Sequence, residues 1–365
     1  MEFKPVLHHL LNSTPGYFQT MNTRFRYILL AALSLPVWGA AQSPVGQPAP
    51  GRLVDIGGYR LHMNATGKGQ PVVVLIAGAN DFSVDWGLVQ PAVARFTQVC
   101  SYDRAGLAWC DLGPLPRTMQ QDVFELHQLL KKANLRGPYV LVGHSIGGLI
   151  ARLFAQQYPT EVAGMVLVDA TSDDTQLLYQ GNMVRVREGA TGKPIPGIQT
   201  IKSSPPKPPT EEDVKQAELN RQVFGAPRIE PPFDKLPLKA QQQRLWALNH
   251  PKLTSAGEDF WAEELQLMYQ QRVQNKALLG TKPLRIMLAD TTKQESPPEG
   301  ISPEEWPTIR AEKVKQKVEV AALSTNSNVI GVAGSGHHIQ LDQPGQVVQA
   351  IREVVNLVKR HTQPD

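Results

Sequence analysis

The chain contains few of the residues on which several functional classes depend. It has only 2 cysteines in 365 residues, and no Cys/His cluster has the spacing of a zinc site. The phosphate-binding patterns GxxxxGK[ST] and GxGxxG are absent. The formal net charge of +4 is small for this length and dispersed, unlike the basic face of a nucleic-acid-binding protein. We therefore expect no metal, no cofactor and no nucleic-acid partner.

What is present indicates a large globular core. Hydrophobic residues make up 41% of the sequence, which fits one large α/β domain with an insertion better than a string of small modules. The two cysteines, Cys100 and Cys110, could pair in an oxidising compartment. Cys100 ends an apolar, β-like run, where a buried thiol is common, so we favour two thiols over a disulfide.

The N-terminal region has the three parts of a secretory signal. Arg24 and Arg26 precede an apolar stretch at 27–38, and small residues up to Ala41 allow cleavage there. The apolar stretch is too short to cross a bilayer well, so we expect no stable membrane span after cleavage. Met21 is the expected translation start, and we expect export to the periplasm or the medium.

The body of the chain alternates strand-like and helix-like segments, which predicts a mostly parallel, doubly wound sheet. Two runs flanking Gly57-Gly58 predict a hairpin that precedes this sheet. The other predicted strands and helices before the first break in alternation are a strand at 71–76, a strand at 96–102, a helix at 119–133, a strand at 139–144 and a strand at 162–168.

The strand at 139–144 runs directly into Gly143-x-Ser145-x-Gly147, the pattern of a nucleophile elbow. A serine on such a sharp strand-to-helix turn is held in strained backbone geometry that projects its hydroxyl over the end of the sheet. The same turn places the amide of Ile146 at a helix N-terminus, where it can donate to a developing oxyanion. The pattern makes Ser145 the candidate nucleophile.

The alternation stops after Asp169, and we interpret residues 172–282 as an inserted helical cap. This segment contains a Pro-rich stretch and three helical segments, at 211–224, 238–248 and 258–279. In the last of these, Trp261, Leu265 and Met268 share one helical face that could cover the serine and bind an apolar substrate. Packing within the cap alone is the alternative for these three residues.

These motifs resemble the α/β-hydrolase superfamily. The resemblance rests on the runs 74–78, 102–106 and 143–148, and on Gly336-His337 followed by Pro344. It covers nearly all of the chain after the signal and implies an α/β-hydrolase fold. The implied organisation is an N-terminal extension and signal at 1–41, a linker at 42–51, a core formed by 52–171 and 283–365, and the cap at 172–282.

The resemblance also implies roles for single residues. His337, directly after a glycine, corresponds to the general base, and the amides of Ala79 and Ile146 correspond to the oxyanion hole. Ala77 stands where the family usually has histidine, but a backbone amide does not depend on that side chain. Asn80 is a weaker candidate for substrate binding.

Two aspartates compete for the third position of the triad. The family's commoner acid follows the strand at 284–288, where Asp290 lies in poor register. Asp169, at the end of the strand after the elbow helix, occupies a position that some similar hydrolases use. We favour Asp169 and keep Asp290 as the alternative.

Other ionisable residues have plainer interpretations. Asp103-Arg104 is expected to form an ion pair or to brace the oxyanion loop, Asp173-Asp174 to be a solvated entry to the cap, and His338 to be a partly exposed neighbour of His337.

The sequence thus predicts an exported serine hydrolase, most simply a carboxylesterase acting on small or medium apolar esters through an acyl-enzyme. Similar epoxide hydrolases and haloalkane dehalogenases have aspartate at the nucleophile position, so Ser145 argues against both. An aminopeptidase or amidase of the proline-iminopeptidase type, or a lactonase, stays open. An aminopeptidase would need acidic cap residues such as Glu258, Asp259, Glu263 and Glu264 to bind an ammonium group. A non-catalytic receptor with the same fold is the alternative of another class. The sequence indicates no oligomeric state.

Overall fold

The computed structural model describes residues 47–179, 182–196, 210–250, 260–290, 297 and 301–362. The predicted signal, its cleavage point at Ala41, the expected start at Met21 and most of the linker at 42–51 lie outside these residues. Within them, no helix combines the length and the apolar character needed to cross a membrane.

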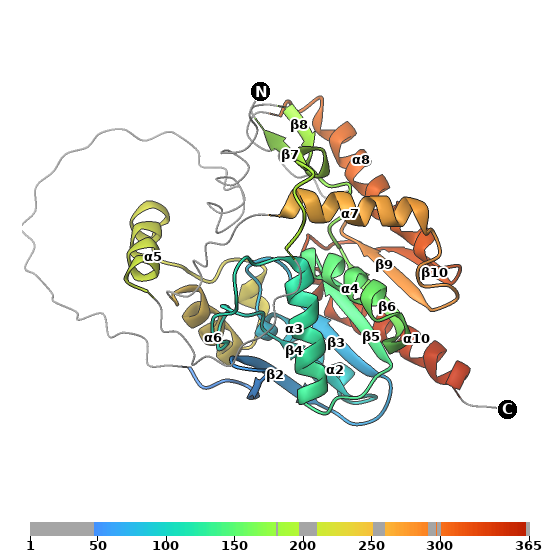
Figure 1. Cartoon of the computed structure of the whole chain (residues 1–365), viewed down its shortest axis with the longest axis horizontal. Helices are drawn as coiled ribbons and strands as arrows, with labels where there is room; N and C mark the ends of the chain where they lie inside the picture. Colours follow the sequence, from blue (N-terminus) through green and yellow to red (C-terminus); the bar gives the residue numbers. More distant parts are fainter. Residues whose placement is uncertain are drawn as a thin grey trace, which may run out of the picture.

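An eight-stranded sheet organises the described residues, in the order β1-β2-β4-β3-β5-β6-β9-β10 (Figure 1). β2 is antiparallel to both β1 and β4, and every other neighbouring pair is parallel. This confirms the predicted mostly parallel α/β sheet. The strands are β1 (Arg52–Asp55), β2 (Arg60–Thr66), β3 (Val72–Ile76), β4 (Val99–Tyr102), β5 (Tyr139–His144), β6 (Val162–Val168), β9 (Leu284–Leu288) and β10 (Ser327–Gly331).

Helices cover both faces of this sheet or belong to the segment between β6 and β9 (Figure 1). They are α2 (Gln90–Val93), α3 (Met119–Lys132), α4 (Ile146–Gln157), α5 (Glu211–Phe224), α6 (Leu238–Leu248), α7 (Trp261–Gln274), α8 (Trp306–Glu319), α9 (Ile339–Asp342) and α10 (Pro344–Thr362). Short 3-10 turns are η1 (Ser83–Trp86), η2 (Pro159–Glu161), η3 (Val186–Gly189), η4 (Phe233–Lys235) and η6 (Val320–Leu323).

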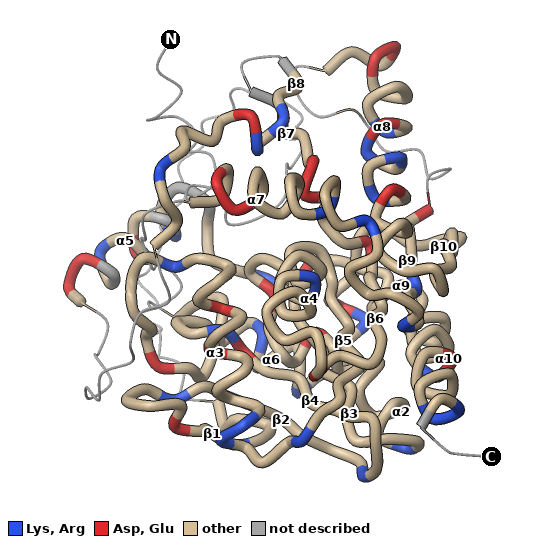
Figure 2. Tube along the Cα trace, turned by 45° about the vertical axis from the view of Figure 1, so that its right-hand side comes forward, with Lys and Arg blue, Asp and Glu red and all other residues tan. Residues whose placement is uncertain are grey.

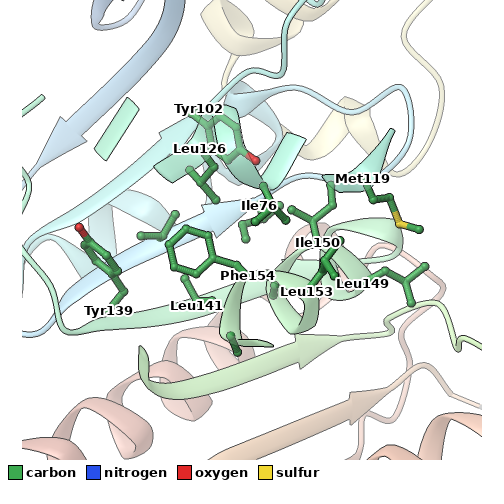
Figure 3. Close-up of a cluster of buried hydrophobic side chains, with 14 of the residues drawn as sticks. Ile76, Tyr102, Met119, Leu126, Tyr139, Leu141, Leu149, Ile150, Leu153 and Phe154 are labelled. Carbon is green, nitrogen blue, oxygen red and sulfur yellow. The ribbon is translucent and has the colours of Figure 1, made fainter. Parts of the chain in front are cut away.

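The central strands are apolar throughout because both of their faces are buried. Along β3, Val72, Val74 and Ile76 join one cluster while Val73 and Leu75 join another on the opposite face. This is the period-2 alternation of a strand covered on two sides. α10 covers one face, and α3 with α4 covers the other, where aromatic and aliphatic side chains interlock (Figure 3). The packing fixes β5 and α4, and therefore the turn between them.

The predicted hairpin at Gly57-Gly58 is present. The amide of Ile56 donates to the carbonyl of Tyr59 over 3.1 Å, and both glycines have positive φ, 126° and 119°. Two-residue hairpin turns of this kind favour glycine because a Cβ would clash at positive φ. β1 and β2 thereby form the antiparallel edge of the sheet.

Between β6 and β9, two predicted helices match α5 and α6 residue for residue, and α7 is shorter than the predicted 258–279. The sequence missed an antiparallel pair, β7 (Gln176–Tyr179) with β8 (Asn182–Arg185). Neither strand has the continuous apolar character of the parallel strands, because both contain polar residues. Cys100 and Cys110 are buried thiols rather than a disulfide, as favoured above.

Candidate active site

Ser145 occupies the turn between β5 and α4, and its backbone is strained. Its φ of 53° and ψ of −124° place a non-glycine residue where L-amino acids rarely lie. The turn is nevertheless held firmly, because the Ser145 amide donates to Val168 over 3.3 Å and its carbonyl accepts from Gly148 and Thr171, both over 3.0 Å. A strained serine held at the carboxyl end of parallel strands is the geometry expected of a nucleophile elbow.

Small residues around the serine allow the backbone to approach closely. A Cβ on Gly147 would lie 2.4 Å from the carbonyl oxygen of Ile76, at the end of β3. A Cβ on Gly78, in the loop after β3, would lie 3.2 Å from the Cβ of Ser145. The loop that carries Ala79 therefore lies beside the nucleophile turn, as an oxyanion hole formed by Ala79 and Ile146 requires.

Arg104 braces this loop. Its two Nη atoms donate to the carbonyl oxygens of Ala77 and Gly78, each over 2.8 Å. Ala79 and Asn80 follow as exposed residues, and Asn80 has a positive φ of 54°. The predicted loop brace is thus present, but the predicted alternative, an Asp103–Arg104 ion pair, is wrong. Asp103 binds His62 at 2.7 Å and the amide of Ser83 at 2.6 Å instead.

His337 and Asp169 form a close pair. His337 Nδ1 lies 2.6 Å from Asp169 Oδ2, although the residues are 168 positions apart in sequence. Asp169 directly follows β6 and has a positive φ of 41°. Its Oδ1 accepts from Lys317 Nζ over 2.7 Å and from the Ala289 amide over 3.2 Å. With Nδ1 on the carboxylate, Nε2 is the ring nitrogen that can exchange a proton with substrate or serine.

The charges around this pair hold the aspartate ionised and the histidine neutral. Burial opposes ionisation of Asp169, but Lys317 and His337 outweigh it and hold its pKa below the ordinary range. Burial lowers the pKa of His337 to about 4, assisted by electrostatic interactions with His144 and Lys317 and opposed by Asp169. A ring that is neutral at neutral pH can accept a proton, as a general base must.

Asp290, the alternative acid, is used differently. Its Oδ2 accepts from the amide of Gly334 over 2.7 Å, and its own amide donates to the carbonyl of Ser335 over 3.1 Å. These contacts hold the loop that leads to His337. Asp290 therefore supports the position of the histidine through the backbone, whereas Asp169 contacts its ring.

A second histidine–aspartate group lies buried against the first. His144 Nε2 lies 3.0 Å from the carbonyl oxygen of His337, and its Nδ1 lies 3.1 Å from Asp81 Oδ2. His338 Nε2 is 3.6 Å from the same Asp81 oxygen, and Arg244 is 3.6 Å from Asp81 Oδ1. His338 is only 5% exposed, so its prediction as a partly exposed neighbour is wrong.

Within the described residues, Asp81, His144 and His338 also form a cluster of side chains of the types that bind metal ions. Their ligand atoms lie within 4.8 Å of one another. Zn²⁺ binds nitrogen at about 2.0–2.1 Å, which needs donors considerably closer together than that spread. The neighbouring Arg244 guanidinium also opposes a cation, so the observed arrangement fits hydrogen bonding better than metal binding.

Two of the predicted cap residues are buried in the main core. Leu265 and Met268 of α7 are 0% and 4% exposed and belong to the same cluster as Leu149 and Leu153 of α4. Trp261 packs against this cluster. In this structure Leu265 and Met268 pack α7 against α4, the helix that follows Ser145. The packing interpretation therefore fits them better than substrate binding.

The interpretation of Asp173-Asp174 as solvated is wrong. Asp173 is 0% exposed and binds Arg152 and Arg272, while Asp174 binds Arg185 and Arg187. Sequence reasoning also missed Lys317, Asp81 and Arg244 at the site. Asp81 lies in the loop at the end of β3, where ligands and catalytic groups gather in open α/β sheets, and that position was the available signal. Lys317 and Arg244 come from helices far along the chain, and nothing in the sequence pattern connected them to the site.

Comparisons with known proteins identify the family and the fold of the chain. The model of the "Alpha/beta hydrolase family" matches residues 73–350. An "AB hydrolase superfamily protein" of Gibberella zeae is 23% identical over 311 residues, which are 80% of this chain and 88% of that protein. The "Probable transporter efuK" of Hormonema carpetanum is 32% identical over 131 residues, which are 34% of this chain and only 19% of that protein.

Solved structures share the fold at low sequence identity. The epoxide hydrolase CorEH has a TM-score of 0.56 and 15% identity, covering 84% of this chain and 98% of that one. A thermophilic esterase from Thermogutta terrifontis has a TM-score of 0.51 and 20% identity, covering 82% and 94%. The family match extends from β3 through the loop of His337 and into α10. The chain is therefore a member of the alpha/beta hydrolase family.

Proposed function

We propose that the protein is an exported serine hydrolase that cleaves small or medium apolar carboxylic esters through an acyl-enzyme. The observation that carries the proposal is the strained turn at Ser145. The preceding residue, His144, lies 3.0 Å from the carbonyl oxygen of His337, and the His337 ring is paired with Asp169. The fold alone does not distinguish between reaction types, because one structural relative is an epoxide hydrolase and another is an esterase. Serine at the elbow, rather than aspartate, favours acyl transfer.

In the proposed reaction, Ser145 Oγ attacks the ester carbonyl carbon while His337 Nε2 takes the hydroxyl proton. Asp169 holds the ring at Nδ1 and stabilises the positive charge that forms on it. The amides of Ala79 and Ile146 donate to the oxyanion, in a loop held by Arg104. The tetrahedral intermediate expels the alcohol, which takes the proton from His337. Water then attacks the acyl-enzyme with the same base and releases the carboxylic acid.

An ester substrate fits the cap better than a peptide N-terminus. Of the four acidic residues that could bind an ammonium group, Glu258 and Asp259 lie outside the described residues. Glu263 accepts from the hydroxyl of Thr191 over 2.8 Å, and Glu264 accepts from the amide of Gln120 over 3.1 Å. Both are engaged in holding the cap segment to its neighbours, which supports esters over aminoacyl substrates.

The test uses a fluorophosphonate probe and a substrate panel. Wild-type protein is expected to be labelled at Ser145 and to hydrolyse p-nitrophenyl esters faster than aminoacyl p-nitroanilides. Ser145→Ala should lose both labelling and turnover, while Ser302→Ala, which removes a hydroxyl in the turn before α8, should keep both. A folded wild-type protein that resists the probe would favour a ligand-binding receptor, and faster cleavage of anilides would favour an aminopeptidase.

Export is proposed from the N-terminal pattern, with Arg24 and Arg26 before the apolar stretch at 27–38. N-terminal sequencing of the protein recovered from a producing cell's periplasm or medium should begin at Gln42. Recovery of an intact N-terminus from the cytosol alone would contradict it.

A further inference from the structure

A cavity of about 140 Å³ lies between α4 and α7, away from the proposed catalytic residues. Arg152 and Gln156 of α4 line one side, and Met268, Gln271 and Arg272 of α7 line the other. α7 lies alongside α4 in both views of the chain, and both helices contain charged residues (Figures 1 and 2). The cavity is several times the ~30 Å³ that one water occupies in the liquid.

The wall of the cavity has an excess of buried positive charge. Asp173 binds both Arg152 Nη2, at 2.7 Å, and Arg272 Nε, at 2.9 Å. The side chains of Arg152 and Arg272 are 4% and 9% exposed, and Asp173 is fully buried. Glu319 also approaches Arg272, at 3.4 Å, but it is 42% exposed and so compensates in a solvated setting. Two buried guanidinium groups thus share one buried carboxylate.

Several buried donors of the lining residues have no hydrogen-bond partner within the described residues. They are Arg152 Nε and Nη1 and Arg272 Nη2, and the amide oxygen of Gln271 is also unpaired. Buried guanidinium N–H groups left without an acceptor cost free energy, and native proteins nearly always satisfy them. The amide of Gln271 could rotate to present its NH₂ group to the same acceptor, since the two orientations are hard to distinguish.

We infer that this cavity binds a small oxyanion, a carboxylate or a phosphate group, between Arg152 of α4 and Arg272 of α7. The planar fork of a guanidinium matches the paired oxygens of both groups. One negative charge would balance the excess positive charge and satisfy donors from both helices at once. Because α4 begins at the nucleophile turn, the anion would attach the cap segment to the helix that positions Ser145.

The experiment measures thermal unfolding of the full chain while sodium acetate, or separately sodium phosphate, replaces sodium chloride at constant ionic strength. A ligand that binds only the folded state raises Tm in a saturable way, and we expect a rise of about 2–4 °C. Acetate alone, or phosphate alone, would identify which source of the oxyanion the site prefers. No saturable rise with either anion would overturn the inference and leave water as the filling of the cavity.

Two variants of one wall residue locate the binding. Gln271→Glu places a carboxylate in the cavity, so its Tm should already be raised and should no longer respond to added anion. Gln271→Leu removes the amide without adding charge and should keep the rise. Neither substitution changes a proposed catalytic residue. Acetate that binds at the proposed active site, as a reaction product would, therefore affects both variants equally. An equal response of the two variants would place the anion elsewhere. The result is also independent of whether the protein is an esterase.

Discussion

His337 with Asp169 and His144 with Asp81 are two histidine–aspartate pairs made of the same chemical groups, and they are in contact. The His337 and His144 rings are 4.7 Å apart between centroids. The side chain of His337 is 36% exposed and binds one partner through one ring nitrogen, whereas that of His144 is 1% exposed and uses both nitrogens. Only the first pair keeps a nitrogen available for proton exchange.

Exposure and the number of partners separate the proposed catalytic pair, His337 with Asp169, from the buried pair, His144 with Asp81. His144 connects Asp81 to the backbone of His337, so it positions the loop of the proposed base. Its electrostatic interaction with His337 also helps to lower the pKa of that ring. Three substitutions test this division of roles, each by changing one pair and leaving the other intact.

The largest effect is expected from Asp169→Asn. An asparagine in place of the carboxylate allows the wrong tautomer of His337 and no longer stabilises its positive charge, so kcat for a p-nitrophenyl ester should fall by about 10⁴. Asp290→Asn is the matched control, because Asp290 binds the backbone of Gly334 and Ser335, whereas Asp169 binds the His337 ring. A greater loss from Asp290→Asn than from Asp169→Asn would assign the acid to Asp290.

Asp81→Asn should act mainly on stability. Burial tends to raise the pKa of Asp81, but His144 and His338 outweigh burial and hold this pKa well below 3.8. The ionised carboxylate therefore stabilises the fold above pH 3.8, and this contribution is lost as the pH falls through the lowered pKa. At pH 7 we expect the free energy of unfolding in urea to fall by about 1.5–3 kcal/mol, as for a hydrogen bond to a charged group.

Turnover by folded Asp81→Asn protein should fall far less than in Asp169→Asn. If the two substitutions reduced turnover equally while Asp81→Asn left stability unchanged, the buried pair would take part in the chemistry. The division between the two pairs would then be wrong.

The smallest effect is expected from Lys317→Gln, and it should appear in pH dependence. The base must be neutral, so activity falls as pH drops through the pKa of His337, which lies below its ordinary value of 6.5. Lys317 is one of the groups that lower it. Its removal should therefore move the acid limb of the kcat/KM profile to higher pH.

Lys315→Gln provides the control for this shift, because Lys315 belongs to the same helix but its side chain is 68% exposed. Its profile should match that of the wild type. An acid limb that stays in place in Lys317→Gln, or moves to lower pH, would show that Lys317 does not tune the base.

Much of the fold could be predicted because local pattern and tertiary environment agree. Continuous apolar runs such as Val72–Ile76 became strands buried on both faces, and the helical periodicity after Thr118 became α3 with Thr118 as its N-cap. β7 and β8 were missed because short, partly polar strands have no strong period. The helix α10, the longest of those described, was not predicted from the sequence, although it covers one face of the sheet.

Within the site, predictions held where the backbone determines chemistry. The strained turn at Ser145 follows from glycines at fixed spacing, and the brace on the oxyanion loop was expected of Arg104. Predictions failed for buried charges: Asp173 was interpreted as solvated and His338 as partly exposed, and both are buried with charged partners from other elements. A lone charged residue in a sequence gives no sign of a partner that lies far along the chain.

The sequence by itself determined the α/β class, the position of the strained turn at Ser145 and the order of the candidate serine, aspartate and histidine. These depend on period, on glycine and on strand-to-helix turns, all of which are local. Only the tertiary structure decided that Asp169 rather than Asp290 contacts His337, that Lys317 joins them, and that Arg152 and Arg272 meet across a cavity. The physical reason is that electrostatic and hydrogen-bond partners are chosen by distance and burial, which arise only when distant segments pack together.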